Sequence, residues 1–87
     1  MSRKEPRDVT EIIRDILASF RRETIVQGTM YCRANLNYKY YQKRYVDPLI
    51  FHGFIEMEKR GKRRYPVIHY TLTNRGQRLL LALGGKP

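Results

Sequence analysis

Cysteine, histidine and acidic residues are scarce in this 87-residue chain, and no long apolar run occurs in it. The one cysteine, Cys32, cannot form an internal disulfide, although it leaves a disulfide across a dimer open. No segment approaches the roughly 20 apolar residues that span a bilayer, and the opening Met-Ser-Arg-Lys-Glu-Pro lacks the apolar core of a signal peptide. We therefore expect a soluble cytoplasmic protein that has no membrane partner.

Residue patterns for metal binding and catalysis are also missing. His52 and His69 lie far apart, and no CxxC or HxxxH spacing is present. The chain has no glycine-rich phosphate loop, and Ser2 and Ser19 have no base near them in the sequence. We predict neither an enzyme nor a protein that carries a metal or another cofactor.

Positive charge is what the chain has in excess. It contains 18 lysines and arginines against 8 acidic residues, a net charge of +10. On so small a surface this excess produces a strong positive field, which favours an anionic polymer as partner. Because 41% of the residues are hydrophobic, the chain is expected to fold as one small domain. Its core is small, so we consider a homodimer as well as a monomer.

The first part of the chain reads as two helices separated by a short strand. Apolar residues at intervals of three and four predict a helix over 9–21, which Asp8 or Thr10 can cap. The β-branched stretch that follows predicts a short strand that ends at Gly28. Thr29 can then cap a second helix of about two turns.

A third helix is predicted between Asn37, which can cap it, and Gly53, which supplies a left-handed end. Pro48 lies inside this helix and removes one backbone donor. The helix should therefore kink at Pro48 or begin anew there with Asp47 as its cap.

The last third of the chain predicts a β-hairpin followed by a closing helix. Residues 54–58 and 65–72 have strand patterns, and Thr73 can cap a helix that ends at Gly84-Gly85. This order predicts an α+β fold, a winged helix-turn-helix with three helices, a two-stranded wing and a short C-terminal helix. We expect the domain to span residues 8–85 and residues 1–7 to form a flexible basic arm.

The third helix has a polar face opposite Tyr41 and Tyr45, which we place in the core. This face can enter a major groove, where cations contact phosphates or guanine and Gln42, if exposed, can pair with adenine. A solvated polar face is the alternative. The candidate contact residues on this helix are Lys39, Tyr40, Gln42, Lys43 and Arg44.

The predicted hairpin tip carries five cations in six residues, more than a turn requires. Such a cluster repels itself unless a polyanion is present, so we interpret it as a phosphate-contacting wing. A solvated turn and a nuclear-localisation signal are the alternatives. The cluster consists of Lys59, Arg60, Lys62, Arg63 and Arg64, and the N-terminal arm adds Arg3, Lys4 and Arg7 as candidates.

Two other functions remain open on the residues alone. Tyrosines interleave with basic residues around position 40, as in proteins that stack the bases of RNA or single-stranded DNA. Winged helices also serve as protein-interaction adaptors. Val46, Ile50 and Phe51 lie off the core stripe, which indicates packing against the wing or a dimer surface.

Three short motifs resemble those of the archaeal winged-helix regulators and ten-kilodalton chromatin proteins. They are Thr29-Met-Tyr-Cys-Arg-Ala-Asn-Leu-Asn-Tyr38, Gly53-Phe-Ile, and Tyr70-Thr-Leu-Thr-Asn-Arg-Gly-Gln-Arg-Leu79. The resemblance covers about residues 9–83. It implies double-stranded DNA binding in an archaeon or an archaeal virus, by a repressor-like regulator or a chromatin protein associated with the nucleoid.

The chain departs from this family pattern at two places. The interval from Asn37 to Gly53 is about one residue longer than the family pattern. The chromatin members dimerise through a long C-terminal helix, whereas few residues follow Gly84-Gly85 in this chain. A dimer would therefore use another surface, such as the N-terminal or the closing helix.

Overall fold

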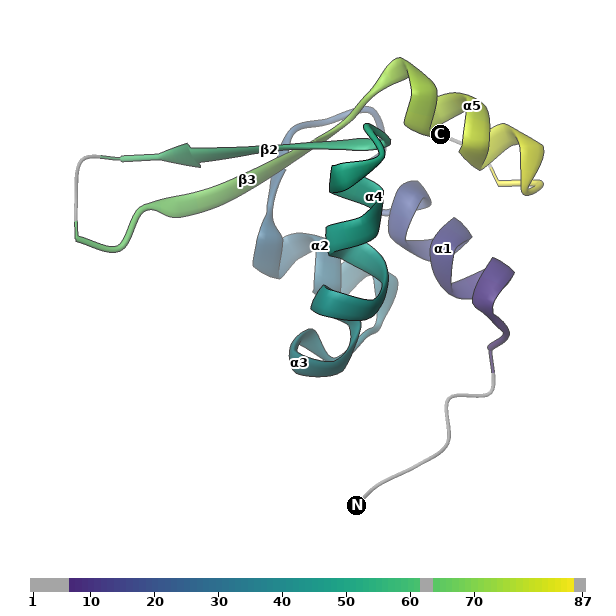
Figure 1. Cartoon of the computed structure of the whole chain (residues 1–87), viewed down its shortest axis with the longest axis horizontal. Coiled ribbons are helices and arrows are strands. Elements are labelled where there is room, and N and C mark those ends of the chain that lie inside the picture. Colours follow the sequence, from purple (N-terminus) through teal and green to yellow (C-terminus); the bar gives the residue numbers. More distant parts are fainter. Residues whose placement is uncertain (1–6, 62–63, 86–87) are drawn as a thin grey trace.

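The computed structural model describes residues 7–61 and 64–85. Within these ranges the elements are α1 (Val9–Ala18), β1 (Ile25–Val26), α2 (Gln27–Ala34), α3 (Tyr38–Tyr41), the π-helical segment η1 (Gln42–Val46), α4 (Asp47–Phe51), β2 (Ile55–Arg60), β3 (Val67–Leu72) and α5 (Asn74–Ala82). The helices form a body from which β2 and β3 project as a long hairpin (Figure 1). The predicted α+β winged-helix architecture is confirmed.

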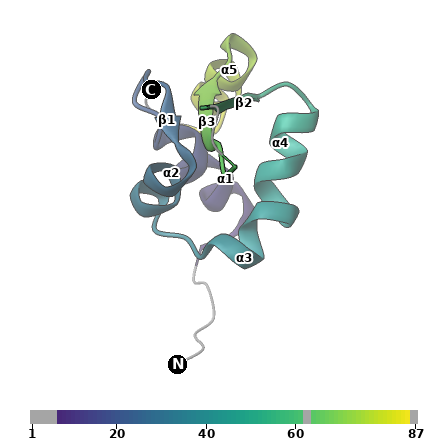
Figure 2. The same ribbon diagram turned by 90° about the vertical axis from the view of Figure 1, so that its left-hand side faces the viewer.

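The sheet is antiparallel, with strand order β1-β3-β2. β1 pairs Ile25 with Tyr70 at the base of the hairpin. β2 pairs with β3 from Ile55 opposite Leu72 to Arg60 opposite Val67. Viewed with the hairpin toward the reader, α2 lies on one side of the sheet and α4 on the other (Figure 2).

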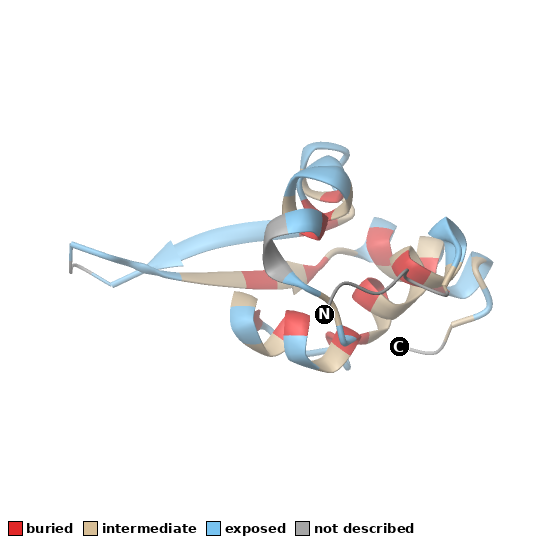
Figure 3. Ribbon diagram, turned by 90° about the horizontal axis from the view of Figure 1, so that it is seen from below, coloured by how far each residue is buried: buried red, intermediate tan, exposed pale blue. Residues whose placement is uncertain are grey.

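The core lies where the three N-terminal helical regions meet the base of the sheet. Ile16, Leu17, Phe20, Met30 and Tyr70 have no exposed surface. Burial ends abruptly along the hairpin, because β2 is exposed at every position after Ile55 (Figure 3). The distal hairpin therefore packs against nothing in the described part of the chain and is free to contact a partner.

The ends of α1 and α2 differ in part from the prediction. The carboxylate of Asp8 accepts from the Glu11 amide at 2.8 Å, so Asp8 and not Thr10 caps α1. The helix ends at Ala18, because Arg21 and Arg22 take left-handed φ values of 49° and 60° in the turn toward β1. Thr29 as a cap was wrong, since α2 begins at Gln27, directly after β1 ends.

The third helical region runs from Tyr38 to Phe51 through the π-helical segment η1. The amide of Asp47 donates to the carbonyl of Gln42, five residues earlier, and Asp47 itself has helical dihedral angles. Of the two alternatives predicted at Pro48, a new helix capped by Asp47 is therefore wrong. Pro48 has no amide to continue an α-helical ladder, and a π turn just before it is one way to accommodate that loss. A π turn also takes one residue more than an α turn, which matches the long interval between Asn37 and Gly53.

The turns around the closing helix follow the prediction. Gly53 has a left-handed φ of 81°. Thr73 caps α5 by accepting from the amide of Gly76 at 3.0 Å. A Cβ atom at Gly76 would lie 2.1 Å from the carbonyl oxygen of Phe54, so only glycine allows α5 to approach the start of the hairpin this closely.

Candidate nucleic-acid interface

The helical run from Tyr38 to Phe51, here called the recognition helix, presents a polar surface to solvent. Lys43 and Arg44 in η1 and Tyr40 in α3 are exposed, as predicted, and Lys39 belongs to α3. The opposite side of the same helix is buried through Tyr41, Val46 and Leu49. The recognition helix is therefore amphipathic, with Lys43 and Arg44 on the outer side.

Aromatic contacts connect this outer surface to the core. The ring of Tyr40 meets the ring of Tyr41 edge-on at 4.8 Å, and Tyr41 stacks on Tyr45 at 5.5 Å. The guanidinium of Arg44 lies over the Tyr40 ring, 5.7 Å from its centre. This cation–π contact restrains the guanidinium without consuming its hydrogen-bond donors.

Gln42 differs from the other candidates on this helix, because its side chain is half-buried and hydrogen-bonded inside the protein. Its amide nitrogen donates to Asp47 at 2.7 Å, and its amide oxygen accepts from the hydroxyl of Tyr31 at 2.5 Å. Gln27 and the buried hydroxyl of Tyr70 complete the cluster. The condition under which Gln42 was expected to read adenine, free exposure, is not met.

The hairpin carries its cations on two faces. Side chains alternate along a strand, and cross-strand partners share a face. Lys59, paired with Ile68, therefore lies on the same face as the buried Ile55, whereas Arg60 lies on the other face. Arg60 and Lys59 belong to β2 rather than to the tip, which corrects their predicted place in the turn.

Acidic neighbours reduce the positive charge of the hairpin only locally. Arg60 donates to Glu58 at 2.9 Å on its own face, an exposed ion pair of small energy. Arg64, in the connection to β3, is exposed. Lys62 and Arg63 lie outside the described residues.

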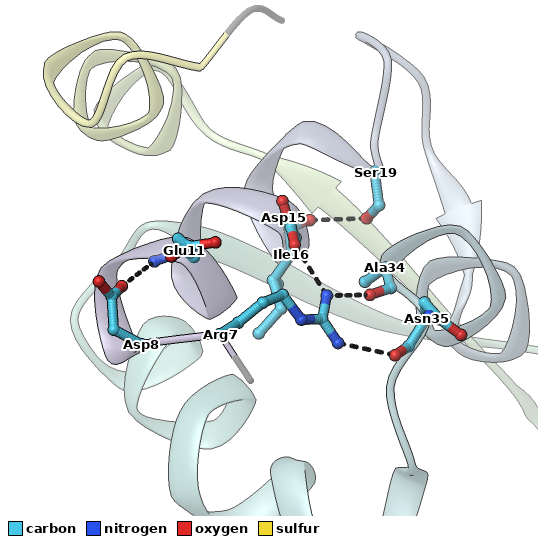
Figure 4. A network of polar contacts seen from close by, with 8 residues as sticks. All are labelled: Arg7, Asp8, Glu11, Asp15, Ile16, Ser19, Ala34 and Asn35. Carbon is cyan, nitrogen blue, oxygen red and sulfur yellow. Dashed lines mark hydrogen bonds and ion pairs between the residues drawn. The ribbon is translucent and has the colours of Figure 1, made fainter. Parts of the chain in front are cut away.

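The N-terminal candidates separate into two groups. Arg3 and Lys4 lie outside the described residues. Arg7 does not belong to a free arm, because its guanidinium lies between α1 and α2 (Figure 4). It donates to the Asp15 carboxylate at 2.7 Å and to the carbonyls of Ala34 and Asn35, both at 2.8 Å. Arg7 therefore has a structural role between α1 and α2, and its contact with DNA stays a prediction.

The sequence did not reveal the polar cluster around Gln42. Gln27, Gln42 and Tyr70 are far apart along the chain, and no motif marks them as neighbours.

Within residues 7–61 and 64–85, no group of three or more metal-ligating side chains occurs. The helices in these same ranges include none that is long and apolar enough to cross a membrane.

A helix-turn-helix pair followed by a projecting hairpin defines the winged helix-turn-helix class of proteins. The family model for the winged helix-turn-helix matches residues 6–84, and the chain belongs to this family. Among solved structures it is similar to Sso10a-2, described as a DNA-binding protein from Sulfolobus solfataricus. That match has a TM-score of 0.76 and 24% identity, and it covers 90% of this chain and 76% of the other. No curated protein matches the sequence. The predicted winged helix-turn-helix family is thus confirmed, and the similar Sso10a-2 comes from an archaeon.

Proposed function

We propose that the protein binds double-stranded DNA, with the recognition helix in the major groove and the hairpin as a wing on the adjacent backbone or minor groove. One observation carries the proposal: both projecting elements of the winged helix expose cations. These cations are Lys43 and Arg44 on the helix and Lys59, Arg60 and Arg64 on the wing. The description of the similar Sso10a-2 as a DNA-binding protein supports the same function.

The dimensions and charge of the two elements suit duplex DNA. A major groove about 12 Å wide admits one α-helix, and a polar outer face such as that of Lys43 and Arg44 can meet its phosphates and base edges. Arginine on a wing is favoured where a narrow minor groove concentrates negative potential. Each phosphate that a cation neutralises contributes about 0.9 to the slope of log affinity against log salt.

The tyrosines give little support to a single-strand-binding module. Tyr31, Tyr41 and Tyr70 are buried in the core. Among the described aromatic residues, Tyr40, Phe51 and Tyr65 are more than half exposed. Tyr40 belongs to α3, Phe51 ends α4, and Tyr65 lies between β2 and β3, so the three are on different elements. A groove that stacks successive bases needs several exposed rings in a row.

Binding titrations at several salt concentrations test the proposal directly. Duplex DNA, single-stranded DNA and RNA of equal length should be compared with the purified protein. We expect tighter binding to the duplex and a steep loss of affinity as salt rises. Equal affinity for all three nucleic acids would contradict the proposal.

The contribution of the wing is tested by two matched substitutions. Arg64→Ala and Arg78→Ala each remove one exposed arginine, the first from the wing and the second from α5. We expect Arg64→Ala to weaken binding equally on different duplex sequences and to lower the salt slope by about 0.9. Arg78→Ala should leave the slope unchanged, and identical slopes for both variants would exclude a phosphate contact by Arg64.

Whether the protein acts as a regulator or as a chromatin protein is decided by selecting bound sequences from a random duplex pool. Enrichment of a palindrome would indicate a sequence-specific regulator that binds as a dimer, because half-site symmetry mirrors protein symmetry. Absence of enrichment would indicate a chromatin-like role based on backbone contacts.

One observation favours the adaptor as a second candidate function. The side chain of Phe51, at the end of the recognition helix, is 83% exposed. Exposed apolar side chains mark protein contacts when they form patches, and β2 also exposes Met57, at 46%. An adaptor would show no preference for duplex DNA in the titrations above.

A further inference from the structure

We propose that Gln42 is a positioning residue, which holds the π turn of the recognition helix and thereby aims Lys43 and Arg44 at DNA. This inference rests on the proposed function and deepens it. Two bonds join Gln42 to Asp47: the backbone bond between the Asp47 amide and the Gln42 carbonyl, and the side-chain bond of 2.7 Å. Lys43 and Arg44 lie between these two residues, inside the π turn.

The side-chain bond is specific to the π turn. An α-helix rotates about 100° per residue, so positions five apart point about 140° away from each other, and neighbours on one face are three or four apart. A π turn, with its longer repeat, brings positions five apart onto nearly the same face. The pair of Gln42 and Asp47 can therefore form while the turn is π-helical and must break if the turn becomes α-helical.

The rest of the Gln42 amide is held by the body of the protein. Its oxygen accepts from Gln27 at 3.2 Å and from the Tyr31 hydroxyl, both in α2. Its nitrogen also donates to the Tyr70 hydroxyl of β3 at 3.1 Å. Gln42 thus joins the recognition helix to α2 and to the central strand that continues into the wing.

The register of this turn decides where the cations point. Conversion to an α turn would rotate the helix on one side of Lys43 and Arg44 by about 100° relative to the other side. Because Val46 is buried at the end of the turn and Leu49 beyond it, the core resists rotation on that side. Lys43 and Arg44, which precede these buried residues, would then turn away from the outer surface on which they now lie with Tyr40.

Three proteins of identical net charge test the role of Gln42: the unmodified protein, Gln42→Leu, and the double variant Gln42→Glu with Asp47→Asn. The leucine removes the side-chain bond, whereas the double variant reverses its direction, with the asparagine amide donating to the glutamate. Gln77→Leu on α5 is the matched control, because it makes the same change away from the recognition helix.

Two measurements are compared across the set. The first is duplex affinity as a function of salt. The second is the rate of hydrogen exchange at the Asp47 amide, whose backbone bond to Gln42 closes the π turn, so that faster exchange reports loosening of this turn without DNA. Lys43→Ala with Arg44→Ala serves as a second background, in which a residue that acts through these cations can have no further effect on binding.

We expect Gln42→Leu to weaken duplex binding about tenfold, to lower the salt slope by up to about 1.8, and to accelerate exchange at Asp47. The double variant should bind duplex DNA with an affinity within about threefold of that of the unmodified protein. The amide of residue 47 should exchange as slowly as it does in the unmodified protein. In the background that lacks both cations, Gln42→Leu should not weaken binding further.

The inference is overturned if Gln42→Leu binds and exchanges like Gln77→Leu, or if the double variant is as weak as Gln42→Leu. It is also overturned if the loss of affinity is the same with and without the two cations, since a general structural defect would behave in this way. If the unmodified protein fails to prefer duplex DNA, the proposed function fails. Faster exchange at the Asp47 amide in Gln42→Leu, but not in the double variant, would then still show that the pair of Gln42 and Asp47 holds the π turn.

Discussion

Substitution of Arg7 by alanine should destabilise the fold and leave the number of DNA phosphate contacts unchanged. The Arg7 side chain is 17% exposed, and its guanidinium joins Asp15 of α1 to the end of α2 (Figure 4). Its donors satisfy the carbonyls of Ala34 and Asn35, at the negative end of the α2 dipole. Arg7 therefore acts as a C-terminal cap for α2 that is supplied from another element.

The size of this destabilisation follows from the three hydrogen-bond partners of Arg7. Each carbonyl contact contributes about 1 kcal/mol after the loss of hydration is included. The ion pair with Asp15, whose side chain is 36% exposed, adds less than about 1 kcal/mol. The free energy of unfolding should fall by about 2–3 kcal/mol, which corresponds to a decrease in Tm of about 10–20 °C in a domain of this size.

Thermal and urea unfolding of Arg7→Ala, Arg7→Lys and Arg78→Ala measure this effect. The ammonium group of lysine cannot reproduce the forked geometry of a guanidinium. Arg7→Lys should therefore recover less than half of the free energy of unfolding that Arg7→Ala loses. Arg78→Ala removes the same charge from an exposed site and should change the free energy of unfolding by less than about 0.5 kcal/mol. Equal stabilities of Arg7→Ala and Arg78→Ala would refute the capping role, and a lower salt slope of DNA binding for Arg7→Ala would return Arg7 to the phosphate contacts.

Three further substitutions test the local structure by urea unfolding. Gly76→Ala should cost about 2–3 kcal/mol, because its Cβ would lie 2.1 Å from the Phe54 carbonyl oxygen; an unchanged midpoint would show that α5 can move away freely. Asp8→Ala should cost about 1 kcal/mol through loss of the α1 cap and Thr10→Ala much less, and the reverse order would assign the cap to Thr10. Asn35 has a φ of 57° at the end of α2, so Asn35→Ala should cost about 1 kcal/mol and Asn35→Gly almost nothing; equal losses would mean that the side chain of Asn35 matters more than its backbone conformation.

Local patterns in the sequence were sufficient for most element types. The cap at Thr73 and the left-handed Gly53 were each visible as a residue type at the end of a periodic segment, whereas the sequence left Asp8 and Thr10 as alternative caps. The hairpin followed from two β-rich stretches around a glycine. These features depend on residues within a few positions of one another, which is why a single sequence can show them.

The failures occurred where a distant segment controls the local conformation. Thr29 looked like a cap, yet pairing of β1 with β3 places the cap position of α2 three residues earlier, at Val26. Arg7 looked like part of a free arm, yet its partners are 8, 27 and 28 residues away in the chain. Gln42 looked like a base-reading residue, yet partners in α2 and β3 draw its amide inward.

The sequence by itself determined the order of the elements, the basic character of the chain and the concentration of cations on the third helix and the hairpin. These properties come from composition and short-range periodicity, which do not depend on how the elements pack. Only the tertiary structure decided which cations face solvent, that Arg7 holds two helices together, and that the recognition helix contains a π turn tied by Gln42. The physical reason is that burial and hydrogen bonding are settled between segments distant in sequence, and the free energy of those contacts outweighs local preference.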